Sequence, residues 1–395
     1  MAYGFRCRRI VFRDSFKEEM KSLLFAIHYM ELGGAEMSLL GLLESLDYSE
    51  YEVDLFVYSH RGELMEFIPK EVNLLPEMLE YKQIERPIKD VLKDGCLRIA
   101  LARLKGKRRF AGYIKSKKGN GGEAIYSYVA RNLVKVLPDI NPDKEYDIAV
   151  SYLMPHDYVL RKVKAKQKVA WIHTDYSKVH VDADLEIPVW SGYDKIVSIS
   201  PDVTSCFLSV FPSLSDKIVE RPNVVPVKYV TTKSNELPPS EVRKEMPVSP
   251  GRINLLSVGR FCEAKNYDNI PDICSKLRNK GLDVYWYLIG FGDMEAVIRE
   301  KIAETGMGDY VNILGKKSNP YPYMKACDFY VQPSRYEGSP MTVLEAIALG
   351  KQVIMTDFPT AKSVASRSPL CHVVPMDNSG CAEGLSDLLN HGSSN

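Results

Sequence analysis

The sequence lacks several features that mark specialised classes of protein. Lysine and arginine total 52 against 51 aspartate and glutamate, so no net charge of one sign argues for nucleic acid as a partner. The 8 cysteines are scattered singly, which argues against a zinc site and against a secreted disulfide framework. No apolar run approaches the length of a membrane-spanning helix. We therefore expect a folded, reduced, cytoplasmic protein, and its 395 residues are enough for two domains.

Residues 1–19 precede the first strand-like run. They are basic, but their apolar stretch is too broken for the hydrophobic region of a secretory signal. A second methionine, Met20, stands just before the first predicted strand. We expect residues 1–19 to be an N-terminal extension, either an upstream start or a loose, disordered arm.

Strand-like and helix-like segments alternate from Ser22 onward. Short apolar runs suit the buried strands of a parallel sheet, and the segments between them have a helical period. Repeated β–α units of this kind imply a doubly wound sheet in each half, so the predicted fold class is α/β with two Rossmann-like domains. The predicted strands are 22–30, 51–59, 146–152, 168–172 and 195–200, then 253–259, 284–290, 310–315, 328–333 and 352–357.

The segment 223–252 separates the two halves. It is rich in proline and has little periodicity, so we predict a linker there. The domains would then span residues 20–222 and 253–395. Two such domains leave a cleft between them, and a ligand is expected in it, beyond the carboxyl ends of the strands.

A strongly basic segment runs from Leu97 to Lys118 without one acidic residue, and apolar residues are interleaved with its cations. It can be a solvated helix face or a mobile insertion. It can also be a patch that contacts an anionic membrane surface, where each basic residue adds about 1 kcal/mol of attraction. The basic residues are Arg98, Arg103, Lys105, Lys107, Arg108, Arg109, Lys115, Lys117 and Lys118.

The most informative stretch is R-Y-E-G-S-P-M-T-V-L-E-A-I-A-L-G-K-Q-V-I, which begins at Arg335. It follows a predicted strand and opens a helix near Pro340, and a helix start presents free N–H groups and partial positive charge that suit a phosphate. The residues at that start are Gly338, Ser339, Pro340 and Met341. Glu337 precedes the helix and Glu345 lies inside it, so one carboxylate can face a sugar hydroxyl while the other accepts hydrogen bonds from a ribose diol.

This stretch resembles the E-x7-E signature of retaining GT4-type glycosyltransferases, the glycosyl transferases group 1 of bacterial surface-polysaccharide synthesis. The bare spacing also occurs by chance at Glu36/Glu44 and Glu63/Glu71, but the embedding between two strands is specific. The resemblance implies a GT-B fold in which Glu337 contacts the donor sugar and Glu345 holds the ribose. A purely structural role for the block is the alternative.

Two further elements of the second half resemble the same family. S-V-G-R-F-C-E-A-K resembles its G-R-x-x-x-x-K element, which implies that Arg260 and Lys265 neutralise the donor diphosphate as the glycosidic bond breaks. L-I-G-F-G-D fails as a dinucleotide fingerprint, because Glu295 stands where a third glycine would be needed. It resembles the family's G-x-G-x turn instead, with Gly290 and Gly292 close to the nucleotide.

In the first half, E-L-G-G-A-E resembles the family's glycine loop, so Gly33 and Gly34 are expected to let backbone approach the donor phosphates. Glycines that serve only a tight turn are the alternative. His173 ends a predicted strand, and relatives place a histidine there beside the donor sugar. Asp182 and Asp184 form a D-x-D without a preceding apolar strand, so we expect no metal and no other cofactor.

The resemblance implies transfer of a hexose or N-acetylhexosamine from a nucleotide-diphosphate sugar, with UDP favoured over GDP, to a saccharide or lipid-linked saccharide. Retention of configuration is implied, with the acceptor hydroxyl attacking on the leaving-group face and the departing phosphate taking its proton. Glu337 would bind a hydroxyl and would not act as a covalent nucleophile. The expected location is cytoplasmic, at the inner face of the plasma membrane.

Relatives usually continue with a helix that crosses back to the first domain, and the sequence ends soon after C-A-E-G-L-S-D-L-L-N. We therefore expect a short or weakly tied C-terminus. Two other functions stay open. A GT-B epimerase or phosphorylase would consume donor without an acceptor, and a non-catalytic nucleotide-sugar binding protein would keep partner binding in Glu337→Ala.

Overall fold

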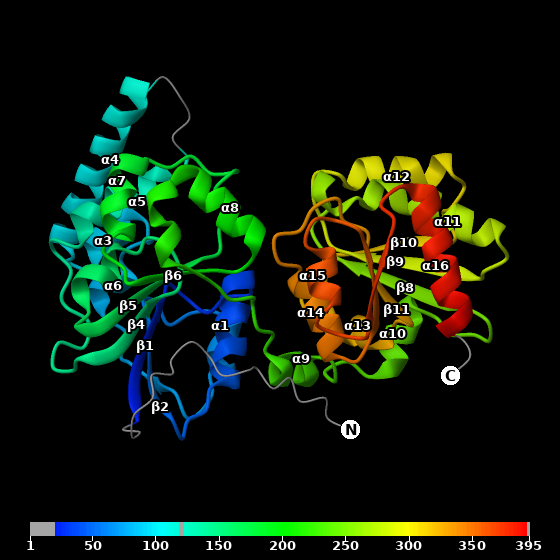
Figure 1. The fold of residues 1–395 in the computed structure, drawn as a ribbon, viewed down its shortest axis with the longest axis horizontal. Coiled ribbons are helices and arrows are strands. Elements are labelled where there is room, and N and C mark those ends of the chain that lie inside the picture. The colour runs from blue at the N-terminus through cyan, green and yellow to red at the C-terminus, as the bar shows by residue number, and fades with distance from the viewer. Residues whose placement is uncertain (1–19, 118–121, 393–395) are drawn as a thin grey trace. The chain divides into compact units, whose positions relative to one another are not determined.

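The computed structural model describes residues 20–117 and 122–392. The chain divides into two compact units, with the boundary between Val224 and Val225, and Figure 1 labels their elements. The expectation of a loose arm at residues 1–19, and the basic residue Lys118, lie outside the described residues.

The first unit is built on a parallel sheet of 7 strands in the order β3-β2-β1-β4-β5-β6-β7. Five of these strands were predicted, and their apolar runs are almost wholly buried, as expected for strands covered on both faces. The strands are β1 (Lys21–Ile27), β2 (Tyr51–Val57), β3 (Asn73–Leu74), β4 (Tyr146–Ser151), β5 (Ala165–Ile172), β6 (Lys195–Ser198) and β7 (Ile218–Glu220).

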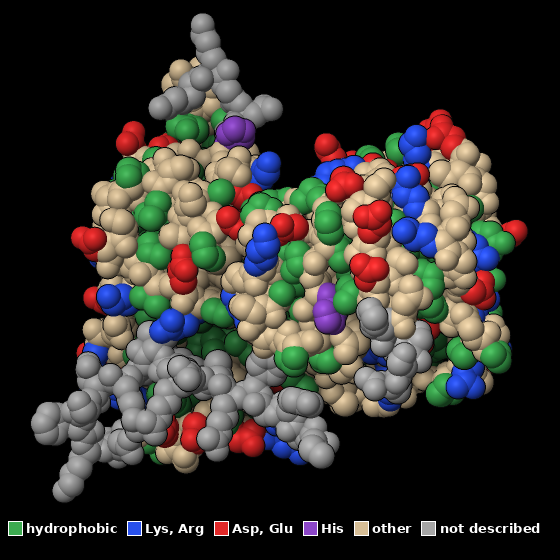
Figure 2. Space-filling model, turned by 45° about the vertical axis from the view of Figure 1, so that its right-hand side comes forward, with side chains coloured by type: hydrophobic (Ala, Val, Ile, Leu, Met, Phe, Trp, Pro, Cys, Tyr) green, Lys and Arg blue, Asp and Glu red, His purple; other side chains and the backbone are tan. Residues whose placement is uncertain are grey.

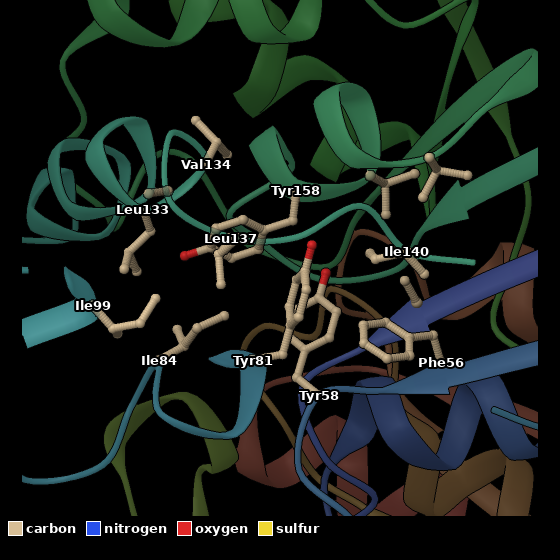
Figure 3. Close-up of a cluster of buried hydrophobic side chains, with 14 of the residues drawn as sticks. Phe56, Tyr58, Tyr81, Ile84, Ile99, Leu133, Val134, Leu137, Ile140 and Tyr158 are labelled. Carbon is tan, nitrogen blue, oxygen red and sulfur yellow. The ribbon is translucent and has the colours of Figure 1, made fainter. Parts of the chain in front are cut away.

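Helices cover both faces of this sheet (Figure 1). They are α1 (Gly34–Ser45), α2 (Leu79–Lys82), α3 (Ile88–Lys93), α4 (Leu97–Lys117), α5 (Ala124–Leu133), α6 (Asp157–Lys162), α7 (Ala183–Trp190) and α8 (Pro201–Val210). On one face the buried rings of Tyr58, Tyr81 and Tyr158 lie together, with ring centroids 5.4 to 6.2 Å apart (Figure 3). This aromatic cluster closes the core beneath the ends of β1 and β2.

The second unit contains a parallel sheet of 6 strands in the order β10-β9-β8-β11-β12-β13. Its strands are β8 (Ile253–Val258), β9 (Val284–Ile289), β10 (Val311–Gly315), β11 (Phe329–Gln332), β12 (Gln352–Thr356) and β13 (Cys371–Val374). Its helices are α9 (Val227–Lys233), α10 (Pro239–Glu245), α11 (Ile270–Asn279), α12 (Glu295–Glu304), α13 (Tyr321–Ala326), α14 (Met341–Ala348), α15 (Ala361–Ala365) and α16 (Asn378–Gly392). The predicted α/β class with two doubly wound parallel sheets is confirmed.

The segment expected to be a linker contains two short helices, α9 and α10. Helix α9 packs on α13 and α14, and α10 packs on α13. Tyr229, Val230 and Val242 are buried in these contacts, and Pro239 stands in the first turn of α10, where its fixed φ favours helix. Residues 227–245 therefore form part of the second unit rather than a free connection.

The basic segment forms one regular helix, α4, and its inner face is packed on α3 and α5. A Cβ on Gly106 would lie 2.7 Å from Val129 Cα, so glycine permits the close approach of α4 to α5. Arg103 is buried and donates to the carbonyls of Gln83 at 2.8 Å and Arg86 at 2.5 Å. The interpretation as a mobile insertion is wrong for residues 97–117, and Arg103 is not one of the outward-facing cations.

No helix among the described residues is both long enough and apolar enough to cross a membrane. Lysine and arginine side chains are interspersed with acidic ones over the face drawn in Figure 2, in keeping with the net charge of +1. The cysteines of residues 20–117 and 122–392 are free thiols.

A buried carboxylate makes the first unit sensitive to pH. Glu186 of α7 is 4% exposed, and it accepts hydrogen bonds from Ser127 Oγ at 2.7 Å and Trp190 Nε1 at 3.3 Å. Burial raises the pKa of Glu186 to about 7, with smaller contributions from the charges of Asp157 and Asp182. The folded state therefore holds this proton more tightly than the unfolded chain, and the resulting stability is lost as pH rises through about 7.

We predict that Glu186→Gln stabilises the protein at pH 8, because the amide keeps an acceptor for Ser127 without an uncompensated charge. The free energy of unfolding should rise by about 1–2 kcal/mol at pH 8 and change little at pH 5. Urea unfolding at both pH values measures this. Asp184→Asn, which alters an exposed acid of the same helix, is the control. It should change the free energy of unfolding by the same amount at both pH values. A destabilised Glu186→Gln at pH 8 would contradict the prediction.

Candidate active site

The strand order of the second unit places the ends of β8 and β11 side by side. These two strands are neighbours, but the chain leaves β8 for β9 on one side and reaches β11 on the other. Such a reversal of strand order leaves a crevice at the carboxyl edge of a parallel sheet, where ligands of this architecture bind. Lys265 ends the short 3-10 helix Glu263–Lys265 that follows β8, and Glu337 lies in the loop after β11.

The carboxylate of Glu337 is fixed through one of its oxygens. Oε1 accepts hydrogen bonds from Lys265 Nζ at 2.6 Å, Gln332 Nε2 at 2.7 Å and Ser334 Oγ at 2.6 Å. The Glu337 side chain is 10% exposed and that of Lys265 is 19% exposed. These three bonds all converge on Oε1, and none of them engages the second oxygen, Oε2.

A shell of buried polar groups orients the donors to Glu337. Tyr330 donates its hydroxyl to Gln332 Oε1 at 2.9 Å, which turns the Gln332 amide nitrogen toward the carboxylate. Thr356 Oγ1 donates to the Ser334 carbonyl at 2.6 Å. Sequence reasoning missed Gln332 and Ser334. The available signal was their position, since both are polar residues at the end of an otherwise apolar strand.

The two predicted cations have different environments. Lys265 makes the ion pair with Glu337, and that carboxylate balances its charge. Arg260 follows β8 in an exposed position and has no ion pair within the described part of the chain. The structure thus brings Lys265, but not Arg260, into contact with Glu337.

Gly290 and Gly292 allow two loops to approach closely. A Cβ on Gly290 would lie 1.9 Å from the Gly259 carbonyl oxygen, and one on Gly292 would lie 2.2 Å from the Phe261 carbonyl oxygen. Phe261 N donates to the Phe291 carbonyl at 2.9 Å across the same contact. These glycines therefore hold the loop after β9 against the loop after β8, which is a structural reason for glycine at both positions.

The start of α14 partly satisfies its own amides. Pro340 caps the helix and has no N–H, and Met341 N donates to the Ser339 carbonyl at 2.9 Å. The expectation that Met341 presents a free amide is therefore wrong for this conformation. Gly338 and Ser339, which follow Glu337 in the sequence, are half-buried. The Glu337 backbone carbonyl accepts a hydrogen bond from Thr360 Oγ1 at 2.9 Å.

Glu345 is buried within α14, with 6% of its surface exposed. Burial raises its pKa to about 7, and a hydrogen bond with the Tyr321 side chain acts in the opposite direction. A carboxyl group with this pKa can exchange its proton near neutral pH. Neither a hydrogen bond nor an ion pair joins Glu345 to Glu337 among residues 225–392.

His173 follows β5 in the first unit. Its ring lies 4.7 Å from the Tyr152 ring and stacks on Trp171 at 6.4 Å. The residue keeps some exposure, but Nε2 is buried without a hydrogen-bond partner in the described part of the chain. Burial lowers the pKa of His173 to about 3, so the imidazole is neutral at physiological pH. A neutral imidazole can exchange hydrogen bonds with a hydroxyl but cannot balance a phosphate charge.

In the first unit, the glycine loop before α1 contacts the side chain of Glu36, whereas we expected it to approach the donor phosphates. Gly33 precedes α1, and a Cβ there would lie 2.2 Å from Glu36 Oε2. Glu36 is buried, and burial raises its pKa. The space beside Gly33 is thus filled by a carboxyl group of the same helix, which explains the glycine without a phosphate. Gly34 is the first residue of α1.

The D-x-D sequence lies at the start of a helix. Asp182 occupies the N-cap position of α7 without a side-chain capping bond, and its carboxylate accepts a hydrogen bond from the Tyr128 hydroxyl at 2.7 Å. Asp184, two residues further along the chain, is exposed. Within residues 20–117 and 122–392, no group of three His, Cys, Asp or Glu side chains is placed to hold a metal ion.

Comparison with known proteins finds a similarity over the part of the chain that contains this site. Residues 240–393 match the family model "Glycosyl transferases group 1". The uncharacterized glycosyltransferase MJ1059 of Methanocaldococcus jannaschii is 28% identical over 152 residues, which are 38% of this chain and 37% of that protein. An N-acetylgalactosamine-N,N'-diacetylbacillosaminyl-diphospho-undecaprenol 4-alpha-N-acetylgalactosaminyltransferase of Campylobacter jejuni is 28% identical over 137 residues, 34% of this chain and 37% of that protein. The match thus spans little more than a third of each of these relatives.

The structural similarity to known proteins extends over more of the chain than the sequence similarity does. The crystal structure of HepE from Anabaena, in complex with UDP and glucose, superposes with a TM-score of 0.59 at 14% identity and covers 94% of this chain and 91% of that one. This likeness concerns the fold, which is of the GT-B type. Lys265 and Glu337 lie within residues 240–393, the part of the chain that is similar to the glycosyl transferases group 1.

Proposed function

We propose that the protein is a retaining glycosyltransferase that moves a hexose or N-acetylhexosamine from a nucleotide-diphosphate sugar to a saccharide or lipid-linked saccharide. The observation that carries the proposal is the Glu337 carboxylate, held through Oε1 by Lys265, Gln332 and Ser334 at the ends of β8 and β11. UDP is the favoured nucleotide, and the UDP held by HepE supports this choice.

In this mechanism the second unit binds the donor, within the domain proposed at residues 253–395. Glu337 Oε2 accepts a hydrogen bond from a donor-sugar hydroxyl and fixes the anomeric carbon. Lys265 exchanges part of its contact with Glu337 for the diphosphate, where negative charge grows as the glycosidic bond breaks, so the interaction strengthens toward the transition state. Arg260 adds a second cation, and the amides of Gly338 and Ser339 face the phosphate.

Glu345 is proposed to hold the ribose diol, and Gly290 and Gly292 to place the loop after β9 near the nucleotide. The acceptor hydroxyl attacks on the face from which the nucleotide leaves, and a phosphate oxygen of the departing nucleotide takes its proton. The bond from the anomeric carbon to the phosphate oxygen breaks as the bond to the acceptor oxygen forms, and no metal is required. His173, in the acceptor domain proposed at residues 20–222, donates or accepts one hydrogen bond to the donor sugar.

The direct test is incubation of the protein with UDP-, GDP- and ADP-sugars, with and without saccharide acceptors, followed by chromatography of the released nucleotide. A transferase releases nucleotide slowly without an acceptor and faster with one, whereas an epimerase converts the donor without any acceptor. If the protein neither binds nor cleaves any of these donors, the proposal is overturned.

We predict that Glu337→Gln lowers transferase turnover by about 10²-fold, because the neutral amide loses the charge that Lys265, Gln332 and Ser334 orient. Initial rates at saturating donor measure the effect, and circular dichroism checks that the fold persists. Glu304→Gln, an exposed acid of α12, is the matched control and should keep full turnover. Unchanged turnover in Glu337→Gln would remove the assigned role.

We further propose that the outer face of α4 docks the protein on an anionic membrane, at the inner face of the plasma membrane. Leu97 and Leu101 are each 57% exposed and Leu104 is 49% exposed, and their spacing puts them on one stripe of the helix. Exposed cations surround this stripe without an acid: Arg98, Lys105, Lys107, Arg108, Arg109 and Lys115. The combination of buried apolar area and positive charge is typical of interfacial helices. The lipid-linked acceptor named for the Campylobacter relative is consistent with it.

We predict that the double variant Lys105→Glu/Arg108→Glu binds vesicles containing phosphatidylglycerol at least about tenfold more weakly than the wild type, because each reversal replaces attraction by repulsion. Flotation with phosphatidylglycerol/phosphatidylcholine vesicles measures binding. Lys70→Glu/Lys135→Glu, which reverses two exposed charges elsewhere in the first unit, is the charge-matched control. The docking role of α4 would be contradicted if both double variants lost vesicle binding equally, or if the wild type did not bind the vesicles.

A further inference from the structure

A second polar cluster lies at the carboxyl edge of the first unit's sheet, and none of its members is used above for donor chemistry. The order β3-β2-β1-β4-β5-β6-β7 reverses between β1 and β4, so the ligand crevice expected of this sheet lies outside the ends of those two strands. β1 ends at Ile27 rather than at Met30 as predicted, and His28 is the first residue beyond it.

His28 has a fixed orientation and one unused nitrogen. Nδ1 lies 2.6 Å from Glu85 Oε1, and a carboxylate can only accept, so Nδ1 carries the proton. In the neutral ring Nε2 then has a free lone pair. Nε2 is buried and has no hydrogen-bond partner among the described residues, and the side chain is 10% exposed. An unpaired buried nitrogen costs free energy, which a bound hydroxyl would recover.

The rim of this cluster is open to solvent. Arg61 lies between Glu31 at 3.2 Å and Glu85 at 3.4 Å, and its guanidinium stands 4.7 Å over the Tyr29 ring. The side chains of Arg61, Glu31 and Glu85 are 42 to 48% exposed, whereas His28 rests on the buried Tyr58 ring at 4.9 Å. The cluster is therefore exposed at one end and closed by the aromatic core at the other.

The balance of charge indicates the kind of ligand. The exposed carboxylates of Glu31 and Glu85 are balanced by two guanidinium groups, that of Arg61, which pairs with both, and that of Arg103, whose charge acts on Glu85. Burial raises the pKa of the third carboxyl group, Glu36. The cluster therefore has no large excess of charge to hold an ionic ligand. Carboxylate oxygens and the lone pair of His28 Nε2 accept O–H donors, and Arg61 donates to hydroxyl oxygens. Adjacent hydroxyls of a sugar ring offer this mixture of donors and acceptors.

We propose that His28, positioned by Glu85, binds a hydroxyl of an uncharged saccharide, which is the terminal sugar of the acceptor. The assignment of this saccharide as acceptor rests on the proposed transferase function, but the existence of the site does not. His28 Nε2 accepts the hydrogen bond, Arg61 and Glu31 contact neighbouring hydroxyls, and Glu85 keeps the imidazole in the tautomer with a free Nε2.

Saturation-transfer NMR on the full chain tests the site without turnover. The probes are methyl glycosides of glucose, galactose and their N-acetylamino forms, compared with glucose 6-phosphate, glucuronate and glucosamine. We expect signals from one or more neutral glycosides and none from the anionic probes. His28→Ala should weaken that binding at least tenfold, and Glu85→Gln should weaken it while the melting temperature stays within a few degrees. His180→Ala, an exposed histidine of the same unit, is the control and should bind as the wild type does.

A parallel titration with UDP separates the two proposals. If UDP binds equally to the wild type and His28→Ala while the glycoside is lost only from the variant, the saccharide site stands. Glycoside binding that is independent of His28, tighter binding of an anionic or amino sugar, or no saccharide binding by the wild type would overturn it. A chain that binds glycosides through His28 but binds and cleaves no nucleotide sugar would refute the transferase function and leave the site intact.

Discussion

The ion pair between Lys265 and Glu337 lies where the second sheet reverses its strand order, and the proposed chemistry depends on it. A carboxylate that is 10% exposed would be costly without a counter-charge, and Lys265 with two neutral donors supplies the compensation. The same arrangement fixes one carboxylate oxygen, Oε1, and balances the charge of the lysine. In the proposed mechanism, Oε2 binds a donor hydroxyl and the donor diphosphate competes with Glu337 for Lys265.

Much of the fold could be predicted, because strands such as β8 and β9 are apolar along their length and buried on both faces. Three strands were missed, β3, β7 and β13. Each lies at an edge of its sheet, where half-exposed, short strands need no apolar run. The helices in 227–245 were missed for a related reason, since their prolines mark helix starts as well as loops.

The candidate site was only partly visible in the sequence. Glu337 and Lys265 were found from local patterns, and the structure joins them at 2.6 Å across 72 residues. Gln332 and Ser334 belong to no sequence motif, and their only signal is a polar residue at the end of an apolar strand, because orienting a carboxylate requires only a donor at the right place. The pairing of His28 with Glu85 spans 57 residues and is set by how the loops after β1 and α2 meet, which no local pattern encodes. The sequence predicts that Gly33 makes space for a donor phosphate, whereas the Glu36 side chain lies in that space.

The most informative experiment is a crystal structure of the protein with an unreactive 2-fluoro analogue of its UDP-sugar. We predict a hydrogen bond of about 2.6–3.2 Å between Glu337 Oε2 and a donor-sugar hydroxyl, with Lys265 Nζ moved toward the diphosphate. The proposed role of Glu337 is contradicted if the donor binds away from the ends of β8 and β11, or if it binds there while all the hydrogen bonds of Glu337 remain within the protein.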